Sequence, residues 1–268
     1  MGMESRRYGY QRISWGGVLT PAVKALLIAN TAVFVLQTFA SMLFENGDVF
    51  LVRSFGLVPR GVTHGLRLWQ PFTYLFLHGG FLHLFFNMLA LWMFGCDLER
   101  VWGKRRFLNY YFLTGVGAGC INILVKTFMD RRINFDSLPL NVITPSMVPT
   151  IGASGAIFGI LIAAAVLFPD RRIYMILPPV ELPMRIYVLI MGAFAFFGTM
   201  GASGDNVSHI SHLGGMAVGY FYLRRGSFFF GMRNRMTDWK RKRMRKKFEV
   251  YMHDHKNEPP SRPDRWVN

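Results

Sequence analysis

The chain has 268 residues, of which 51% are hydrophobic and only 17% are charged. Soluble domains carry about 25% charged residues, so this composition argues against a soluble protein and for a membrane protein. The two cysteines form neither a disulfide framework nor a metal-binding spacing. The formal net charge of +16 is unevenly placed, because 11 of the 31 Lys and Arg lie between Arg224 and Lys247.

Six apolar stretches come into consideration as membrane spans, for which about 20 residues are needed. They comprise residues 21–44, 81–96, 107–125, 151–168, 186–200 and 207–223. We therefore predict an all-α fold, a polytopic membrane bundle of six transmembrane helices over residues 21–225. An N-terminal segment over residues 1–20 precedes this bundle, and a tail over residues 226–268 follows it.

The placement of Lys and Arg predicts the orientation, because cytoplasmic segments are enriched in positive charge. With the N-terminus inside, the inner segments before the tail hold ten Lys and Arg, whereas the outer loops hold five arginines. An even number of spans brings the chain back to the inner side. We expect a multi-pass protein of the cell membrane with both termini in the cytoplasm.

Two segments outside the spans are informative. Residues 45–80 are too interrupted by Gly and Pro to span, so we predict an irregular outer loop, placed either in the membrane interface or as an ordinary packed loop. Residues 240–247 contain seven basic residues in eight. Beside a membrane, such a cluster attracts anionic lipid headgroups. Nucleic-acid binding is the alternative, but no nucleic-acid-binding motif accompanies the tail, and we expect no such partner.

Polar side chains within spans are costly in free energy and therefore mark candidate functional sites. His83 and Asn87 lie in the second span, Ser154 begins the fourth, and His209 and His212 begin the sixth. These three spans all enter from the outer face in the predicted topology. The polar residues therefore share one depth, a few residues below the outer surface, which indicates a single site.

Glycine spacing predicts how the fourth and sixth spans pack. Glycines four residues apart allow two helices to approach closely in lipid. Such pairs occur in both spans: Gly155 and Gly159 in the fourth, Gly215 and Gly219 in the sixth. Packing through these glycines brings Ser154 within reach of His212, as a serine nucleophile and its general base require.

A serine nucleophile also needs hydrogen-bond donors for the oxyanion that forms during attack. Ser154 lies near a helix N-terminus, where backbone N–H groups are unpaired. His83 and Asn87 are one helical turn apart on the same face and can add side-chain donors. Because the fourth and sixth spans contain no Asp or Glu, we predict a Ser–His dyad that uses no metal and no other cofactor.

These residues lie in sequences that resemble the rhomboid proteases in their minimal six-span bacterial form. The matching motifs are HGGFLHLFFN at 78–87, GASGAIFG at 152–159, HLGG at 212–215 and ERVWG at 99–103. In the first outer loop the chain has Trp69-Gln70, where rhomboids often have Trp-Arg. The resemblance extends over roughly residues 21–225.

The resemblance implies a function and a role for each residue. It implies Ser154 as nucleophile, His212 as base, and His83 and Asn87 as donors to the oxyanion. It also implies cleavage of transmembrane protein substrates near the outer end of their helix. We expect the substrate to enter between spans, with the span 186–200, rich in Gly and Phe, as the candidate gate.

Other interpretations of the same residues stay open. Ser154 can be a small packing residue, His209 can be the base in place of His212, and Asn87 can merely bond a neighbouring helix. Two further classes of function are an inactive rhomboid-like protein that binds membrane proteins without cutting them, and a metal-binding or transport protein. The latter requires histidine ligands with carboxylates behind them and a metal-dependent activity.

Overall fold

The computed structural model describes residues 18–133, 143–175, 180–200 and 209–224. The chain divides into two compact units, Met1–Phe221 and Tyr222–Asn268, and each is considered by itself. Of the second unit, only residues 222–224 are described, and they are helical. The predicted tail over 226–268, with its basic cluster, lies outside the described residues.

Each of the six predicted apolar stretches contains a helix. α1 (Pro21–Leu43), the run Phe81–Trp102 and α7 (Lys104–Asp130) are long and apolar enough to cross a membrane. The run consists of α5 (Phe81–Ala90), a π-helical turn (Leu91–Gly95) and α6 (Cys96–Trp102). α8 (Ser154–Leu167) and α9 (Met184–Met200) are shorter, and residues 209–224 form the last described helix. The chain is thus a mostly helical membrane protein, and six crossings stay a prediction.

The N-terminus of α1 is capped by a carboxylate from α6. Glu99 accepts hydrogen bonds from the backbone N–H of Ala22 at 2.9 Å, from that of Val23 at 3.0 Å, and from the Thr20 hydroxyl. The first N–H groups of a helix have no intrahelical acceptor, and the helix dipole favours an anion there. This capping explains why a carboxylate is buried where α1 and α6 meet.

The loop between α1 and α5 is more regular than predicted. It contains three short helices: α2 (Gly47–Phe55), α3 (Pro59–Thr63) and α4 (Gln70–Thr73). Pro59 and Pro71 occupy the first turns of α3 and α4. Proline is well accommodated there because its missing N–H would have no helical acceptor anyway. The prolines that suggested interruption therefore begin helices.

Gln70 is central to this loop. Its fully buried side chain donates to the Arg53 carbonyl at 3.0 Å and accepts from the Val58 N–H at 3.1 Å. The neighbouring Trp69 indole donates to the Ser54 carbonyl at 2.9 Å. The Trp69-Gln70 pair thus connects α4 to the C-terminal end of α2.

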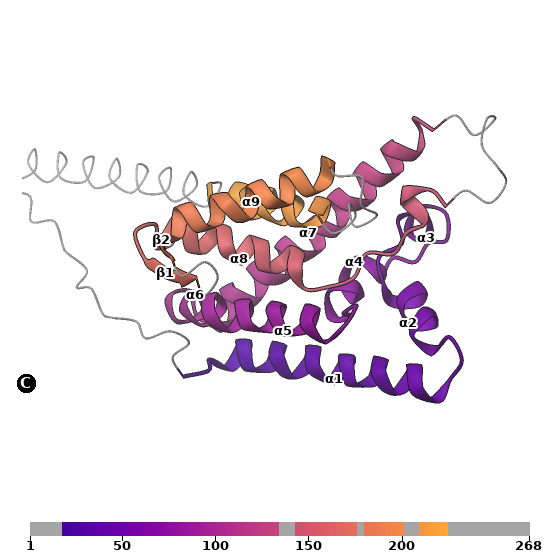
Figure 1. Cartoon of the computed structure of the whole chain (residues 1–268), viewed down its shortest axis with the longest axis horizontal. Coiled ribbons are helices and arrows are strands. Elements are labelled where there is room, and N and C mark those ends of the chain that lie inside the picture. Colours follow the sequence, from indigo (N-terminus) through magenta and orange to yellow (C-terminus); the bar gives the residue numbers. More distant parts are fainter. Residues whose placement is uncertain (1–17, 134–142, 176–179, 201–208, 225–268) are drawn as a thin grey trace, which may run out of the picture. The chain divides into compact units, whose positions relative to one another are not determined.

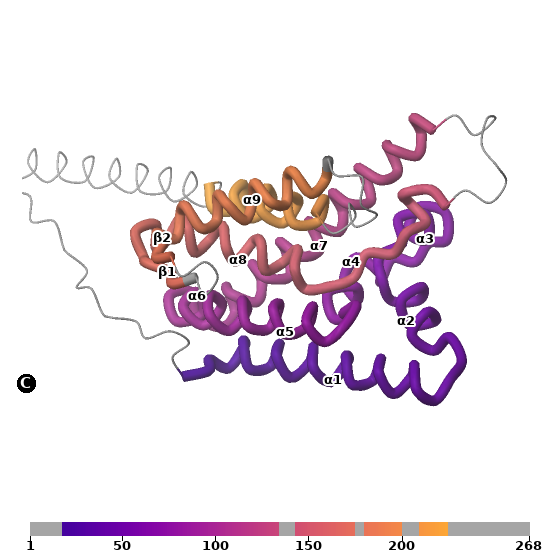
Figure 2. The backbone as a smooth tube through the Cα atoms, viewed as in Figure 1, coloured from indigo at the N-terminus to yellow at the C-terminus, as the bar shows by residue number. Residues whose placement is uncertain are grey.

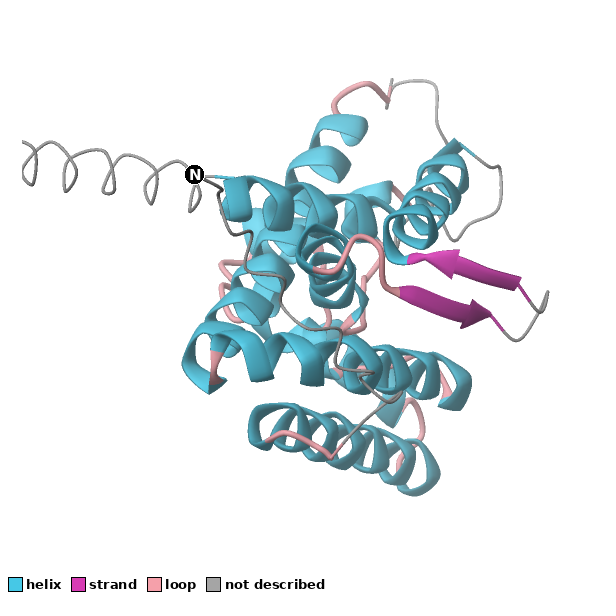
Figure 3. Ribbon diagram, turned by 90° about the vertical axis from the view of Figure 1, so that its left-hand side faces the viewer, coloured by secondary structure: helices cyan, strands magenta, loops and turns pink. Residues whose placement is uncertain are grey.

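An antiparallel hairpin adds one small sheet to the mostly helical fold that the sequence predicts. β1 (Arg172–Met175) pairs with β2 (Val180–Pro183), with Ile173 opposite Leu182, between α8 and α9. Figure 3 shows this hairpin projecting from the helices. Strands of four residues are too short to reveal their alternation against long apolar helices, which is why the sequence did not predict them. Arg171, which precedes β1, forms an ion pair with the buried Asp97 of α6.

α8 occupies the centre of the helical arrangement. It lies between α5 and α9 and also packs against α7 (Figure 1); the same order is visible in the backbone tube (Figure 2). Close packing on α7 depends on small residues: a Cβ atom at Gly159 would lie 2.5 Å from Thr114 Cβ. Ser154, the first residue of α8, is therefore surrounded by other helices.

Candidate active site

Ser154 and His212 lie in hydrogen-bond contact. The distance from Ser154 Oγ to His212 Nε2 is 2.8 Å, although 58 residues separate them in sequence. The ring of Phe158, one turn further along α8, stacks on the imidazole with a centroid distance of 4.2 Å and an interplanar angle of 8°. This stacking fixes the plane of the imidazole, and a neutral imidazole at this distance can accept the hydroxyl proton.

Direct backbone contact between two helices sets the Ser154–His212 distance. A Cβ atom at Gly215 would lie 1.9 Å from the Gly155 carbonyl oxygen, and one at Gly219 would lie 3.2 Å from Gly159 Cα. Any larger residue at position 215 must push the helices apart. The four glycines with four-residue spacing therefore lie at the closest approach of α8 and the helix over 209–224.

His83 lies beside the nucleophile with a defined proton position. The Gly79 N–H donates to His83 Nδ1 at 3.3 Å, so in the neutral ring the proton is on Nε2. Gly152 has φ +121°, and a Cβ atom there would lie 2.8 Å from His83 Nε2. The Nε2–H group is therefore next to the backbone that leads into Ser154.

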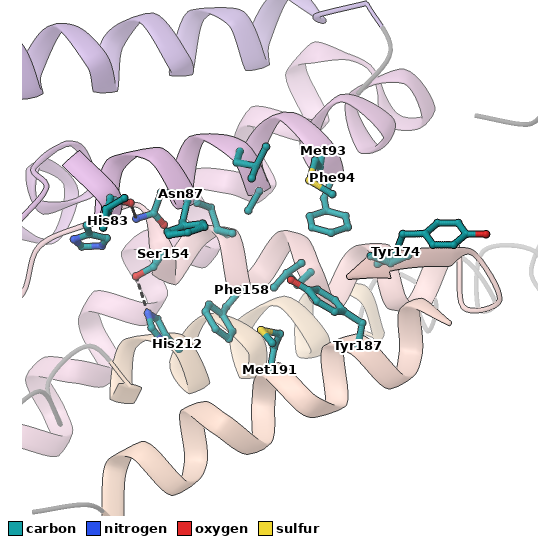
Figure 4. A pocket seen from close by; sticks show the side chains of 17 residues that line it. His83, Asn87, Met93, Phe94, Ser154, Phe158, Tyr174, Tyr187, Met191 and His212 are labelled. Carbon is teal, nitrogen blue, oxygen red and sulfur yellow. Dashed lines mark hydrogen bonds between the residues drawn. The ribbon is translucent and has the colours of Figure 1, made fainter. Parts of the chain in front are cut away.

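Asn87 lies one turn beyond His83 on α5. Its amide nitrogen donates to the His83 carbonyl at 2.8 Å, which uses one of its two hydrogens. Figure 4 shows Asn87 and His83 on the side of Ser154 opposite to His212. His83, Asn87, Ser154 and His212 all line one cavity.

Neither His78 nor His209 forms a hydrogen bond with Ser154 in the described part of the chain. His209 is 5.8 Å from His212 between ring centroids and packs against Gly198 of α9. His78 is buried with its ring edge toward His83, and burial lowers the pKa of His78 to about 4, with the neighbouring His83 contributing. Among the described residues, no group of three or more His, Cys, Asp or Glu is arranged to hold a metal ion.

A cavity of about 600 Å³ extends from the Ser154–His212 pair along α8. Its walls come from α5, the π-helical turn, α8, β1 and α9, and they are mostly apolar. Besides the site residues, its side chains include Phe86, Met93, Phe94, Tyr174, Tyr187 and Met191 (Figure 4).

Only part of the predicted gate, residues 186–200, lines the cavity. Tyr187 and Met191 of α9 line it, whereas Phe194 and Phe197 are exposed. The four-residue spacing of Tyr187 and Met191 could have indicated that both line the same cavity, because residues four apart share a helix face. Tyr174 could not be found this way, since it reaches the cavity from the unpredicted hairpin.

Comparison with known proteins identifies the family. Residues 65–226, more than half of the chain, match the Rhomboid domain. The chain belongs to the rhomboid family, and the resemblance seen in the motifs is confirmed. Together with its long apolar helices, this membership makes it a membrane protein.

Individual relatives are similar over parts of their length. RHOMBOID-like protein 12, mitochondrial, from Arabidopsis thaliana is 29% identical over 85% of this chain and 68% of its own length. Rhomboid protease GluP from Bacillus subtilis is 29% identical over 63% of this chain and 28% of its own length. Rhomboid protein 1, mitochondrial, from Saccharomyces cerevisiae is 32% identical over 55% of this chain and 38% of its own length. This chain therefore spans between about a quarter and about two thirds of these relatives.

Proposed function

We propose that this chain is an intramembrane serine endopeptidase that cleaves transmembrane proteins with a Ser154–His212 dyad. Family membership makes it a serine-protease hydrolase. The observation that carries the assignment of residues is the 2.8 Å contact between Ser154 Oγ and His212 Nε2 at one end of an apolar cavity.

The geometry supports a sequence of proton transfers. His212 Nε2 takes the Ser154 proton while Oγ attacks the substrate carbonyl, and the resulting oxyanion accepts hydrogen bonds from His83 Nε2–H and Asn87. His212 then donates its proton to the leaving amine, and an acyl-enzyme remains. Water attacks the ester with His212 again as base, which releases the acid product and restores Ser154. No cofactor is required.

The orientation of His212 is explained by stacking. Among the described residues, no carboxylate forms a hydrogen bond with this imidazole, whereas Phe158 covers its face at 4.2 Å. Stacking fixes the ring plane but adds no negative charge to stabilise the imidazolium. The negative charge of the oxyanion is stabilised separately, by the His83 and Asn87 donors.

The apolar cavity supports an apolar, extended segment of a transmembrane substrate as the ligand. An unwound helix exposes backbone polar groups, which are costly in lipid but are satisfied at a polar site.

The proposed topology has six spans in the cell membrane and both termini in the cytoplasm. Cleavage takes place near the outer face, and the basic tail lies against anionic headgroups. Two of the relatives described above carry "mitochondrial" in their names. Membrane fractionation is therefore the direct test of which membrane holds this protein.

The test is cleavage of a fluorogenic transmembrane-segment substrate by the purified protein in detergent, with and without a chelator. We expect chelator-resistant activity that is lost in Ser154→Ala and His212→Ala and kept in the matched control His209→Ala. Activity that survives in Ser154→Ala would sink the mechanism. Inactivity of the wild type on several substrates would favour the rhomboid-like binder, and loss of activity with chelator would favour the metal-dependent class.

A further inference from the structure

Lys126 is an ionisable residue buried in α7, a helix long and apolar enough to cross a membrane. It lies in the last part of α7 and its residue exposure is 1%. Ionisable groups inside membrane helices are costly in free energy and therefore mark function by default. The ion pairs among the described residues do not include Lys126. Asp130, one turn further, accepts hydrogen bonds from the Thr144 hydroxyl at 2.9 Å and the Ser146 N–H at 3.2 Å, and its charge also acts on Lys126.

The side-chain nitrogen of Lys126 binds the segment that leads into α8. Nζ donates to the Val148 carbonyl at 2.7 Å and to Thr150 Oγ1 at 3.1 Å. Both acceptors belong to the non-helical residues 148–152, just before Ser154. Buried hydrogen bonds are stronger than those in water, because the surrounding medium has a low dielectric constant. Lys126 thus connects this segment to α7.

The same segment is bonded to the loop between α1 and α5. The Thr150 N–H donates to the Leu57 carbonyl at 2.8 Å, and the Leu57 N–H donates to the Thr150 carbonyl at 2.9 Å. The Gly152 N–H donates to the Tyr74 carbonyl at 2.9 Å. Residues 148–152 are therefore held between α7 and this loop, and Gly152 is held against the His83 ring.

We propose that Lys126 is a positioning residue: its two hydrogen bonds fix residues 148–152 and thereby the placement of Ser154 relative to His83 and His212. This inference rests on the proposed function of the site. Lys126 itself does not touch the reacting atoms, since it acts through Val148 and Thr150. Its loss should impair the chemical step while leaving the substrate cavity, which it does not line, unchanged.

The test compares Lys126→Met, Lys126→Arg and Thr150→Val with the wild type in detergent. Thr150→Val removes one acceptor and keeps the shape of the side chain. The matched control is Lys24→Met, at an exposed lysine of α1. Two rates are measured: covalent labelling of Ser154 by a fluorophosphonate, which reports the nucleophile alone, and cleavage of the transmembrane-segment substrate, resolved into kcat and KM.

We expect Lys126→Met to lower both the labelling rate and kcat by roughly 10- to 100-fold, because small misplacements of reacting groups have effects of this size. KM should stay within about twofold of wild type, as expected when an interaction acts on the transition state alone. Thr150→Val should show a smaller loss in the same direction. Lys126→Arg should recover part of the rate, and Lys24→Met should match the wild type.

The inference is overturned if Lys126→Met labels and cleaves like Lys24→Met. It is also overturned if the rates fall only in proportion to the folded fraction, measured by thermal unfolding of the same samples. If Lys126→Met fails to fold, the labelling and cleavage rates of Thr150→Val are compared with those of Lys24→Met instead. Equal rates in these two variants would then overturn the inference. Absence of labelling in the wild type contradicts the proposed function instead, so the two failures are distinguishable.

Discussion

Gly152 shows how closely the candidate site depends on single residues. Its φ of +121° is one that residues with a side chain rarely adopt, and the space a Cβ atom would need is occupied by the His83 ring at 2.8 Å. Gly152 thus allows the His83 ring to lie directly against the backbone that carries Ser154.

We expect Gly152→Ala to lower kcat by about 100-fold, because it displaces His83 or the backbone before Ser154. Gly79→Ala is the matched control, since a Cβ atom there has no neighbour closer than 3.7 Å. The measurement is substrate cleavage in detergent for both variants. Equal activity of the two would show that the contact between residue 152 and His83 is unimportant.

The low pKa of His78 predicts acid sensitivity of the fold. His78 lies before α5, and its burial holds the pKa near about 4, below its ordinary value of 6.5. As the pH falls from 6.5 to about 4, the unfolded chain takes up a proton that the folded ring resists, so the free energy of unfolding decreases. Thermal unfolding at pH 7 and pH 5 should show a smaller decline for His78→Gln than for wild type. An equal decline would assign the acid sensitivity to other groups.

Sequence reasoning reached some site residues and missed others for a physical reason. The motifs mark Ser154 and His212 because both are polar side chains within apolar stretches, where they are costly in free energy. The proton position on His83 follows from the Gly79 N–H, and the role of Lys126 depends on two acceptors in a segment far along the chain. None of these three hydrogen bonds has a periodic signal in the sequence.

At the scale of elements, Glu99 determines how α1 begins. Its carboxylate accepts bonds from two backbone N–H groups of the first turn of α1 and from the Thr20 hydroxyl. We expect Glu99→Gln to lower the free energy of unfolding by about 1.5 to 3 kcal/mol, the range for hydrogen bonds to charged groups. Thermal unfolding in detergent measures the change.

Glu45→Gln, at an exposed position after α1, provides the comparison for Glu99→Gln and should leave the midpoint of unfolding unchanged. Similar midpoints for the two variants would mean that the cap contributes little to the docking of α1.

Element boundaries differ from the prediction where hydrogen bonding and apolarity end at different residues. The second apolar stretch ends at Cys96, but the helix continues through Asp97 and Glu99 to Trp102, because these carboxylates have partners in Arg171 and α1. Hydropathy shows where a run of apolar residues ends, whereas a helix ends where its backbone hydrogen bonds end. Sequence reasoning therefore located the helices better than their ends.

For the whole molecule, the main prediction concerns orientation. Fusion of a fluorescent protein or of alkaline phosphatase after residue 268 should give fluorescence without phosphatase activity, because both termini are expected in the cytoplasm. Insertion of either reporter near Gly65, in the loop between α1 and α5, should give the reverse. Phosphatase activity at the C-terminus would contradict a cytoplasmic C-terminus.

The length of α8 has a consequence for the solvent of the reaction. Its 14 residues extend about 21 Å, whereas the hydrocarbon core of a bilayer is about 30 Å thick. If the end of α8 at Leu167 lies at the inner boundary of this core, the hydrolytic water must pass about 9 Å of acyl-chain region to reach Ser154. Membrane thickness then becomes a kinetic variable, and vesicles of shorter-chain lipids should support faster deacylation than those of longer-chain lipids.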